Sequence, residues 1–302
     1  MEIGLGIDSR LVLSNAEQAD VAAEAARLGY TSLWTPSRDD AFALCALWHR
    51  ASGLEVGISV MPLERWDADR LIASTRTALE RTAGKFVLGV GSGRARGAPI
   101  RKMRDLVTTL RTALGAGRIY LAALGPQMLH LAGERYDGAA LNWCSPEQTR
   151  WSREHVAAGA LVAGRDPRAV RIHQYIRVCV DPDVAAARVA LAKTVLGYAM
   201  HRPDGDRSKG YRAHFARMGF DEVLIELEAL RDRGADDDVL SERLPDELLA
   251  QVGWWGRPED AAAGFEALTA GLDTAVVRVV PAKTNDVDCV RLAMRSCMGS
   301  AR

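Results

Sequence analysis

Short apolar runs alternate along the chain with longer stretches in which apolar residues recur at helical spacing. The first run, Ile3 to Asp8, is typical of a β-strand. Ser14 and Glu17 have the spacing of a capping box, which indicates that a helix begins there, and Gly29 marks its end. A second strand-like run, Thr31 to Pro36, follows almost at once. The pattern predicts a βαβ unit.

The same alternation continues to the end of the chain. Six more strand-like runs follow, Val56 to Met61, Phe86 to Gly91, Ile119 to Leu124, Gly138 to Trp143, Val170 to Val180 and Thr274 to Pro281. Helical stretches separate most of them, including Leu106 to Leu114 and a helix that begins at Ser145-Pro146-Glu147. A doubly wound open sheet also fits this alternation, but no nucleotide-type glycine fingerprint follows the first run. We therefore predict an α/β fold, a (β/α)8 TIM barrel, with residues 1–302 as a single domain.

The connection between the last two predicted strands, from Val180 to Thr274, is long enough to carry an elaborated set of helices. The helices predicted there are Asp183 to Met200, Asp221 to Gly234, Pro245 to Gly253 and Pro258 to Leu272. We interpret the polar stretch His201 to Gly210 and the acidic triplet Asp236-Asp237-Asp238 as exposed loops. We do not expect the triplet to bind calcium, because it lacks the spacing of a calcium-binding loop.

Charge and composition narrow the range of partners. Lys plus Arg and Asp plus Glu both total 39, so no net charge attracts a polyanion, and we expect neither nucleic acid nor a membrane as a partner. No signal-peptide pattern opens the chain, and nowhere do about 18 apolar residues follow one another, which predicts a cytoplasmic protein.

The five cysteines lack CxxC spacing and are interpreted as reduced, mostly buried thiols. The six histidines lack HExxH or facial-triad spacing, so no metal site is predicted.

Small residues follow several predicted strands, at the end of the barrel where active sites of this fold lie. Gly91-Ser92-Gly93 follows the fourth strand and Gly125-Pro126 the fifth. Such residues allow main-chain N–H groups to approach a flat or anionic ligand, and Pro126 opens a predicted helix, Gln127 to Glu134, whose positive end would face it. The alternative is that these glycines only make turns.

Three segments together resemble the luciferase-like family (the bacterial luciferase superfamily) of flavin- or coenzyme F420-dependent oxidoreductases. The strongest is Tyr120 to Gln148, YLAALGPQMLHLAGERYDGAALNWCSPEQ, which is similar to the fifth-strand, helix and sixth-strand signature of deazaflavin-dependent members. KFVLGVGSG, Lys85 to Gly93, is similar to the fourth-strand motif. LPDELLAQVG, Leu244 to Gly253, followed by Arg257-Pro258-Glu259, fits the C-terminal region of the family. The likeness covers nearly the whole chain.

The resemblance implies a cofactor site at the strand ends. It places Ser59-Val60 where relatives have a non-prolyl cis peptide behind the cofactor ring, and Ser37 where relatives often carry an acidic residue near the ring. The remaining residues that it implies are Ser92 and Gly93 beside the ring or its side chain, Ala123, Leu124, Gly125 and Gln127 around the phosphate, and Asn142 near the same site. The segment between Gly93 and Tyr120 is shorter than in relatives, so we expect a shortened connection from strand 4 to strand 5 and an open pocket.

We expect coenzyme F420 as the cofactor and hydride transfer between this deazaflavin and a small organic substrate as the function. Asp8 is the first candidate for the proton donor, because it ends a strand, and His173 is a second candidate. Tyr175 and Arg278 are also placed to point inward if the period-two alternation has that phase. Two alternatives remain open, an FMN-dependent monooxygenase and a flavin-binding barrel without catalysis. The resemblance also implies a homodimer.

Overall fold

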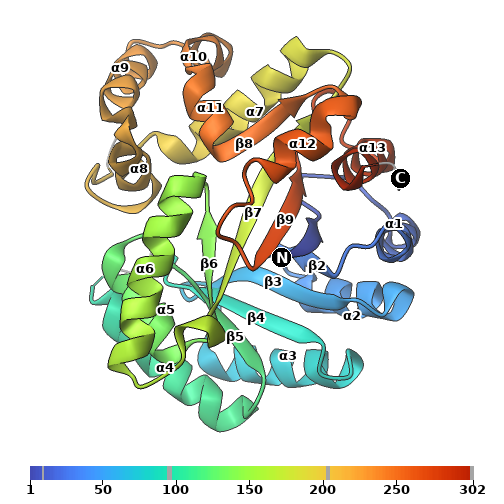
Figure 1. Cartoon of the computed structure of the whole chain (residues 1–302), viewed down its shortest axis with the longest axis vertical. Helices are drawn as coiled ribbons and strands as arrows, with labels where there is room; N and C mark the ends of the chain where they lie inside the picture. The colour runs from blue at the N-terminus through green and yellow to red at the C-terminus, as the bar shows by residue number, and fades with distance from the viewer. Residues whose placement is uncertain (9, 94–96, 202–204, 300–302) are drawn as a thin grey trace.

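The computed structural model of the chain describes residues 1–8, 10–93, 97–201 and 205–299. These residues form one parallel nine-stranded sheet, and eight of its strands close into a barrel. The eight are β1 (Glu2–Gly6), β2 (Ser32–Thr35), β3 (Glu55–Pro62), β4 (Phe86–Gly91), β5 (Arg118–Ala122), β6 (Gly138–Asn142), β7 (Arg171–Val180) and β9 (Thr274–Val279). Closure comes from β7, which pairs with β6 on one side and with β9 on the other. The predicted (β/α)8 barrel is confirmed (Figure 1).

Helices surround the barrel, as expected from the βαβ alternation (Figure 1). They are α1 (Asn15–Arg27), α2 (Ala41–Ser52), α3 (Ala68–Arg81), α4 (Pro99–Leu114), α5 (Pro126–Arg135), α6 (Pro146–Val162) and α13 (Val287–Met298). The capping box predicted at Ser14 and Glu17 is present, and the hydroxyl of Ser145 accepts a hydrogen bond from the N–H of Gln148 at the start of α6. In the described part of the fourth connection the helix is α4, which begins earlier than predicted.

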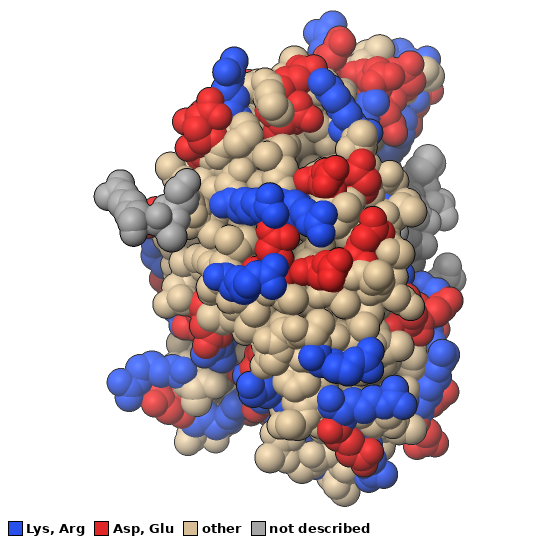
Figure 2. All heavy atoms as spheres, turned by 90° about the vertical axis from the view of Figure 1, so that its right-hand side faces the viewer, with Lys and Arg blue, Asp and Glu red and all other residues tan. Residues whose placement is uncertain are grey.

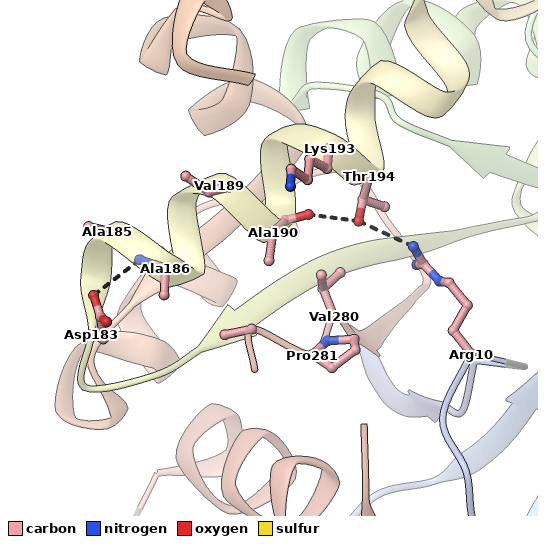
Figure 3. Close-up of a pocket in the computed structure, with 11 residues that line it drawn as sticks. Arg10, Asp183, Ala185, Ala186, Val189, Ala190, Lys193, Thr194, Val280 and Pro281 are labelled. Atoms are coloured by element: carbon pink, nitrogen blue, oxygen red, sulfur yellow. Dashed lines mark hydrogen bonds between the residues drawn. The ribbon is translucent and has the colours of Figure 1, made fainter. Parts of the chain in front are cut away.

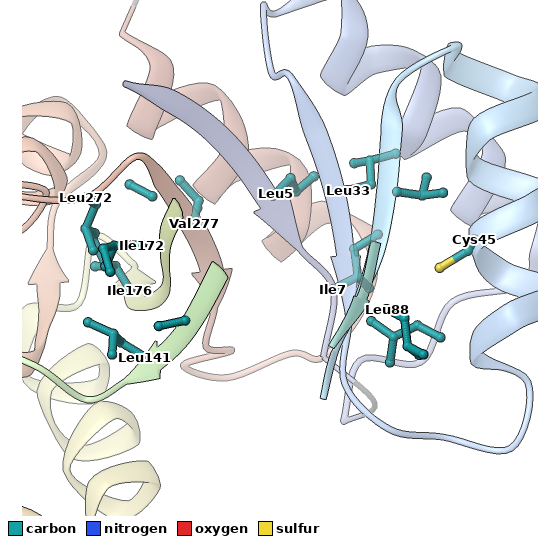
Figure 4. Packing of buried hydrophobic residues seen from close by; sticks show 14 of the residues in the cluster. Leu5, Ile7, Leu33, Cys45, Leu88, Leu141, Ile172, Ile176, Leu272 and Val277 are labelled. Carbon is teal, nitrogen blue, oxygen red and sulfur yellow. The ribbon is translucent and has the colours of Figure 1, made fainter. Parts of the chain in front are cut away.

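The strands pack an apolar face against these helices. Along the strands, every second side chain points outward and lies between the sheet and the helices (Figure 4). The outward residues that are fully buried include Leu5, Leu33, Leu88, Ile176 and Val277. Burying the side chains of this layer is the main driving force for closing the barrel, at roughly 25 cal/mol per Å² of apolar surface.

The other phase of the strands fills the barrel interior with a few large rings and many glycines. Trp34, Tyr120 and Tyr175 belong to one buried interior cluster. The indole of Trp34 occupies the space that a side chain at Gly57 would need, and Tyr120 does the same at Gly138. Because aromatic side chains on some strands lie against glycines of the adjacent strands, the interior of the barrel is densely packed below the mouth.

The long connection between β7 and β9 forms a helical layer over one end of the barrel (Figure 1). It contains α7 (Val184–Ala199), α8 (Gly210–Phe215), the π-helical turn η2 (Ala216–Phe220), α9 (Asp221–Asp232), α10 (Asp237–Arg243), α11 (Asp246–Val252), β8 (Gly253–Gly256), the 3-10 turn η3 (Pro258–Asp260) and α12 (Ala261–Glu266). The layer has an apolar core of its own, which includes Leu191, Phe215, Leu224 and Leu248.

Two predictions for this connection are corrected, and two of its elements, β8 and α8, were not predicted. The acidic triplet is no loop, because Asp236 caps α10 through the N–H of Val239. The helix expected over Pro258 to Leu272 ends at Glu266. The strand β8 was not predicted, because four residues are too short to show alternation. The helix α8 was also missed, since it begins at the end of the polar stretch; residues 202–204 of that stretch lie outside the described part of the chain.

Charged side chains of both signs are interspersed on the face that carries α1 and α13 (Figure 2). Glu24 on α1 forms ion pairs with Arg291 and Arg295 on α13 there, so opposite charges neutralise one another locally. Among the described residues, no helix combines the length and the hydropathy that crossing a membrane requires.

Candidate active site at the barrel mouth

The predicted site residues converge at one end of the barrel. Since all barrel strands are parallel, residues at or just beyond their carboxyl ends share one mouth. The residues found there are Asp8 beyond β1, Ser37 beyond β2, Ser59 and Val60 near the end of β3, Ser92 and Gly93 beyond β4, Ala123, Leu124, Gly125 and Gln127 beyond β5, and Asn142 at the end of β6. His173 lies lower, in the first half of β7.

The peptide bond between Ser59 and Val60 is cis, as the resemblance implies. The pairing of β3 with β4 shifts its register between Ile58 and Met61, and the cis peptide lies within this irregular part of the strand pairing. A side chain at Gly89 of β4 would overlap with this backbone, and one at Gly91 would press on Val60. The two glycines therefore let the Ser59–Val60 backbone lie close to β4, with Val60 half-buried at the mouth.

The start of α5 offers main-chain donors that no side chain caps. Gly125 is the N-cap residue and Pro126 begins the helix, as predicted. The N–H groups of Gln127 and Met128 have no acceptor within the helix, because they belong to its first turn. A side chain at Gly125 would meet no atom within 4 Å, so the space before these N–H groups is open. This arrangement suits an anion such as a phosphate.

The loop beyond β4 forms an exposed rim of the mouth. Gly93 has a φ of 55°, a left-handed conformation that favours glycine, and a side chain there would collide with the carboxylate of Glu64. Ser92 in this loop and Ser37 in the loop beyond β2 are both partly exposed. The described residues are therefore accessible at the mouth beyond β2 and beyond β4.

Asp8 is held as a carboxylate, which argues against the proton-donor role predicted for it. Its Oδ2 accepts from Nη2 of Arg278 at 2.6 Å, and Arg10 donates to the same carboxylate. Burial alone would raise the pKa of Asp8, but the charges of Arg278 and Arg10 and the hydrogen bonds from Arg10 bring it well below the usual range. An acid that stays ionised at neutral pH has no proton to give.

The position of His173 also argues against the catalytic role predicted for it. The side chain points inward, but it is 0% exposed, and its ring centroid lies 4.0 Å from that of Trp34 and 6.1 Å from that of Tyr120. Burial lowers its pKa to about 3, helped by the charge of Arg171. A neutral imidazole enclosed by rings below the mouth has no access to a substrate.

Arg177 is a mouth residue that the sequence reasoning missed. It follows His173 and Tyr175 at period-two spacing on β7, which is the signal that identifies its inward direction. Its Nη1 donates to Oδ1 of Asn142, and its guanidinium lies 3.9 Å from the ring centroid of Trp143. Burial lowers the pKa of Arg177 to about 10, so the group stays charged at neutral pH.

Helix α8 covers the mouth beside β5 and β6. Nδ2 of Asn142 donates to the hydroxyl of Tyr211 at 2.6 Å, and Nε2 of His214 lies 2.8 Å from the carbonyl oxygen of Trp143. In η2, which follows, Nη2 of Arg217 donates to the carbonyl oxygen of Leu124 at 3.0 Å. The helical layer thus contacts the mouth next to the open start of α5.

Two grooves border the mouth. One, of about 610 Å³, runs between α7 and the segment that follows β9, and Arg10 and Thr194 line it together with Val280 and Pro281 (Figure 3). Arg10 joins this groove to Asp8, and its Nη1 lies 3.3 Å from the hydroxyl of Thr194. The second, of about 580 Å³, is lined by residues of α8 and η2 that include Arg217. Both grooves are open depressions beside the site.

The fold defines the chain as a (β/α)8-barrel protein, with the predicted site residues gathered at the carboxyl ends of its strands. Residues 94–274 match the profile of the luciferase-like monooxygenase family. The chain belongs to this family, which confirms the resemblance predicted from its sequence.

Comparison with known proteins supplies relatives of similar length. The chain is 24% identical to a 5,10-methylenetetrahydromethanopterin reductase of Methanolobus tindarius, over 97% of this chain and 98% of that protein. Its fold is similar to that of the coenzyme F420-dependent tetrahydromethanopterin reductase from Methanopyrus kandleri, with a TM-score of 0.76, 16% identity and 98% of both chains covered. The monooxygenase RslO1 from Streptomyces bottropensis matches with a TM-score of 0.64, 14% identity, and 99% and 98% of the two chains covered.

Proposed function

We propose that this protein is a coenzyme F420-dependent oxidoreductase that transfers a hydride between the deazaflavin and a small organic substrate. The single observation that carries the proposal is the mouth between β3 and β5, where the Ser59–Val60 backbone and the uncapped start of α5 flank the glycines of β4. The tetrahydromethanopterin reductase from Methanopyrus kandleri, whose fold is similar, is coenzyme F420-dependent and supports the same cofactor.

The residues present fit such a cofactor. The open space at Gly125 and the free N–H groups at the start of α5 suit its phosphate, with Gln127, Ala123 and Leu124 around it. Val60 and Ser59 offer a small, partly buried surface for the ring. Ser37, Ser92, Gly93 and Asn142 complete the proposed set around the ring and its side chain.

The chemistry belongs to the cofactor, which when bound would donate or accept a hydride at its ring. The protein would bind and orient the ring through the backbone of β3 and the loop beyond β4, and the packed barrel below would exclude water from one side. Asp8, which stays ionised, would position the guanidinium of Arg278 at the mouth. His173 would support the floor of the site through its contact with Trp34.

The second candidate is an FMN-dependent monooxygenase, because RslO1 shares the fold and the matching family carries that description. Oxygen chemistry on a flavin requires shielding from water, and the exposed rim formed by Ser92 and Gly93 does not favour it.

The test is a titration of the purified chain with F420 and, separately, with FMN, followed by absorbance and by the quenching of cofactor fluorescence. Micromolar or tighter binding of F420, with hydride exchange from the reduced form to a panel of imines and enones, is the expected result. Tight binding of FMN alone would identify the monooxygenase. Binding of F420 or FMN with no turnover across the panel would identify the non-catalytic barrel.

A further inference from the structure

Two arginines lie side by side at the mouth, on neighbouring strands. Arg177 of β7 and Arg278 of β9 are register partners, and both side chains point into the barrel. Each is only 4% exposed. The guanidinium carbons lie 5.8 Å and 4.6 Å from the ring centroid of Tyr175, so both charges flank one phenol ring. Like charges directly opposite one another on paired strands are destabilising.

The described side chains supply one buried carboxylate for these two cations. Asp8 pairs with Arg278, whereas the acceptors of Arg177 are neutral, Oδ1 of Asn142 and, at 3.4 Å, the carbonyl oxygen of Tyr175. Nη1 of Arg278 and the hydroxyl of Tyr175 are buried and have no hydrogen-bond partner among the described residues. The group formed by Arg177, Arg278, Tyr175 and Asp8 therefore has an excess of positive charge and hydrogen-bond donors without acceptors in the described part of the chain.

Arg212, another buried arginine of the chain, differs from Arg177 because carboxylates lie beside it. Arg212 in α8 is 3% exposed, and two carboxylates, those of Glu228 and Asp221, form ion pairs with it. This contrast matters because a buried guanidinium without a carboxylate is unfavourable unless something else supplies the negative charge. At Arg177 that charge is missing from the described residues.

We propose that Arg177 and Arg278, with the Tyr175 hydroxyl, bind a carboxylate carried by the substrate. This inference rests on the proposed function, since it names the substrate class of the same mouth. Guanidinium groups pair with carboxylates through charge-assisted hydrogen bonds, and the phenol adds a third donor. The proposed phosphate seat is the start of α5, which follows β5, whereas the two arginines lie on β7 and β9. Asn142 of the proposed cofactor set contacts Arg177, so the titration with saturating F420 described below decides whether the acidic group belongs to the substrate or to the cofactor.

The test uses benzoate as the probe and benzamide as its neutral counterpart, added to the full chain at constant ionic strength. The shift of the unfolding midpoint and the tryptophan fluorescence, to which Trp143 contributes beneath Arg177, give the binding curve without any turnover. Arg177→Met is the test variant. Arg171→Met is the matched control, because Arg171 lies on the same face of β7 but pairs with Glu2 at the opposite end of the barrel.

We expect benzoate to stabilise the wild type and Arg171→Met, and its affinity to fall about tenfold or more in Arg177→Met. Benzamide should produce no comparable shift. Without any anion, Arg177→Met should unfold at the same temperature as the wild type or higher, since it removes one of two like charges. A merely structural arginine would instead lower that temperature.

Equal shifts with benzoate and benzamide, or a benzoate affinity unchanged in Arg177→Met, would overturn the proposal. Repeating the titration with saturating F420 separates the two sources of an anion. Loss of the benzoate response under that condition assigns the arginines to an acidic group of the cofactor and overturns the substrate assignment. If F420 fails to bind while the Arg177-dependent benzoate response persists, the proposed cofactor is wrong and the carboxylate site stands.

Discussion

Trp34 of β2 and Gly57 of β3 are register partners, and the six-membered ring of Trp34 lies where a side chain at position 57 would project. The indole N–H donates to the hydroxyl of Ser32 at 2.8 Å, which fixes the orientation of the ring. A tryptophan of this size is accommodated inside a narrow barrel because the adjacent strand presents hydrogen instead of a β-carbon.

Gly57→Val should therefore destabilise the protein by about 1–3 kcal/mol or more, because the new side chain and the indole overlap in a packed interior. Urea unfolding followed by fluorescence measures the change. Gly197→Ala in α7 is the control, since a β-carbon there meets no atom within 4 Å, and it should leave stability unchanged or raise it by about 0.5–1 kcal/mol. A valine at 57 without loss of stability would contradict the packing described.

The two fully buried histidines predict a pH dependence of stability. Burial lowers the pKa of His173 to about 3 and that of His214 to about 4, whereas in the unfolded chain both stay near 6.5. The unfolded state therefore binds more protons below pH 6.5, and each histidine should reduce the free energy of unfolding by about 1.4 kcal/mol per pH unit as the pH falls.

Urea unfolding between pH 7.5 and pH 5.5 tests this, because carboxyl groups contribute little in that window. His173→Leu should lose about half of the slope. Its stability at pH 7.5, where both histidines are neutral, measures the packing effect alone and serves as the internal reference. A slope that does not change in His173→Leu would show that the imidazole is protonated in the folded protein.

Asp8→Asn should destabilise the protein by about 3–5 kcal/mol at pH 7, because it leaves Arg278 buried without a counter-charge. The pKa of Asp8 is depressed in the folded state, so its contribution is present above pH 4 and is lost as the pH falls toward the folded-state pKa. The variant should therefore show a flatter pH dependence below pH 4. Asp166→Asn, at an exposed pair with Arg168, should change the unfolding free energy little.

Gly125→Asp should separate cofactor binding from folding. The backbone at Gly125, with φ of −99° and ψ of 158°, suits an aspartate N-cap, so α5 should be as stable as before or slightly more so. Its carboxylate would occupy the N–H groups proposed for the phosphate and repel it, and the Kd for F420 should rise about tenfold or more. Gly125→Ser, which caps without charge, should have a smaller effect. Unchanged F420 affinity in Gly125→Asp would place the phosphate elsewhere.

The barrel itself was predictable because each strand has its own apolar run and several of the helices have a start signal of their own. Ser14 and Ser145 mark their helices in the sequence as clearly as in the structure. The helical connection was less predictable. Gly253–Gly256 forms a strand only because β7 extends past the barrel and offers residues 177–180 as a partner, which is a tertiary effect.

For the site, strand ends and family resemblance located the mouth, and the cis bond at Ser59–Val60 agrees with that resemblance. The alternation along β7 does not show how far each residue lies from the mouth. His173, Tyr175 and Arg177 share one inward phase, so alternation treats them alike, but only the last two reach the mouth. The ionised state of Asp8 depends on Arg278, a partner at the other end of the sequence, and no local pattern reveals that pairing.

The ring layer of Trp34, Tyr120 and His173 has a kinetic consequence. Because these side chains close the barrel below its mouth, ligands enter and leave from one side only. Two ligands that share a single entrance cannot exchange independently when one lies beneath the other. Cofactor and substrate therefore share one entrance, and product inhibition measured against each ligand would show whether the bound substrate blocks the exchange of the cofactor.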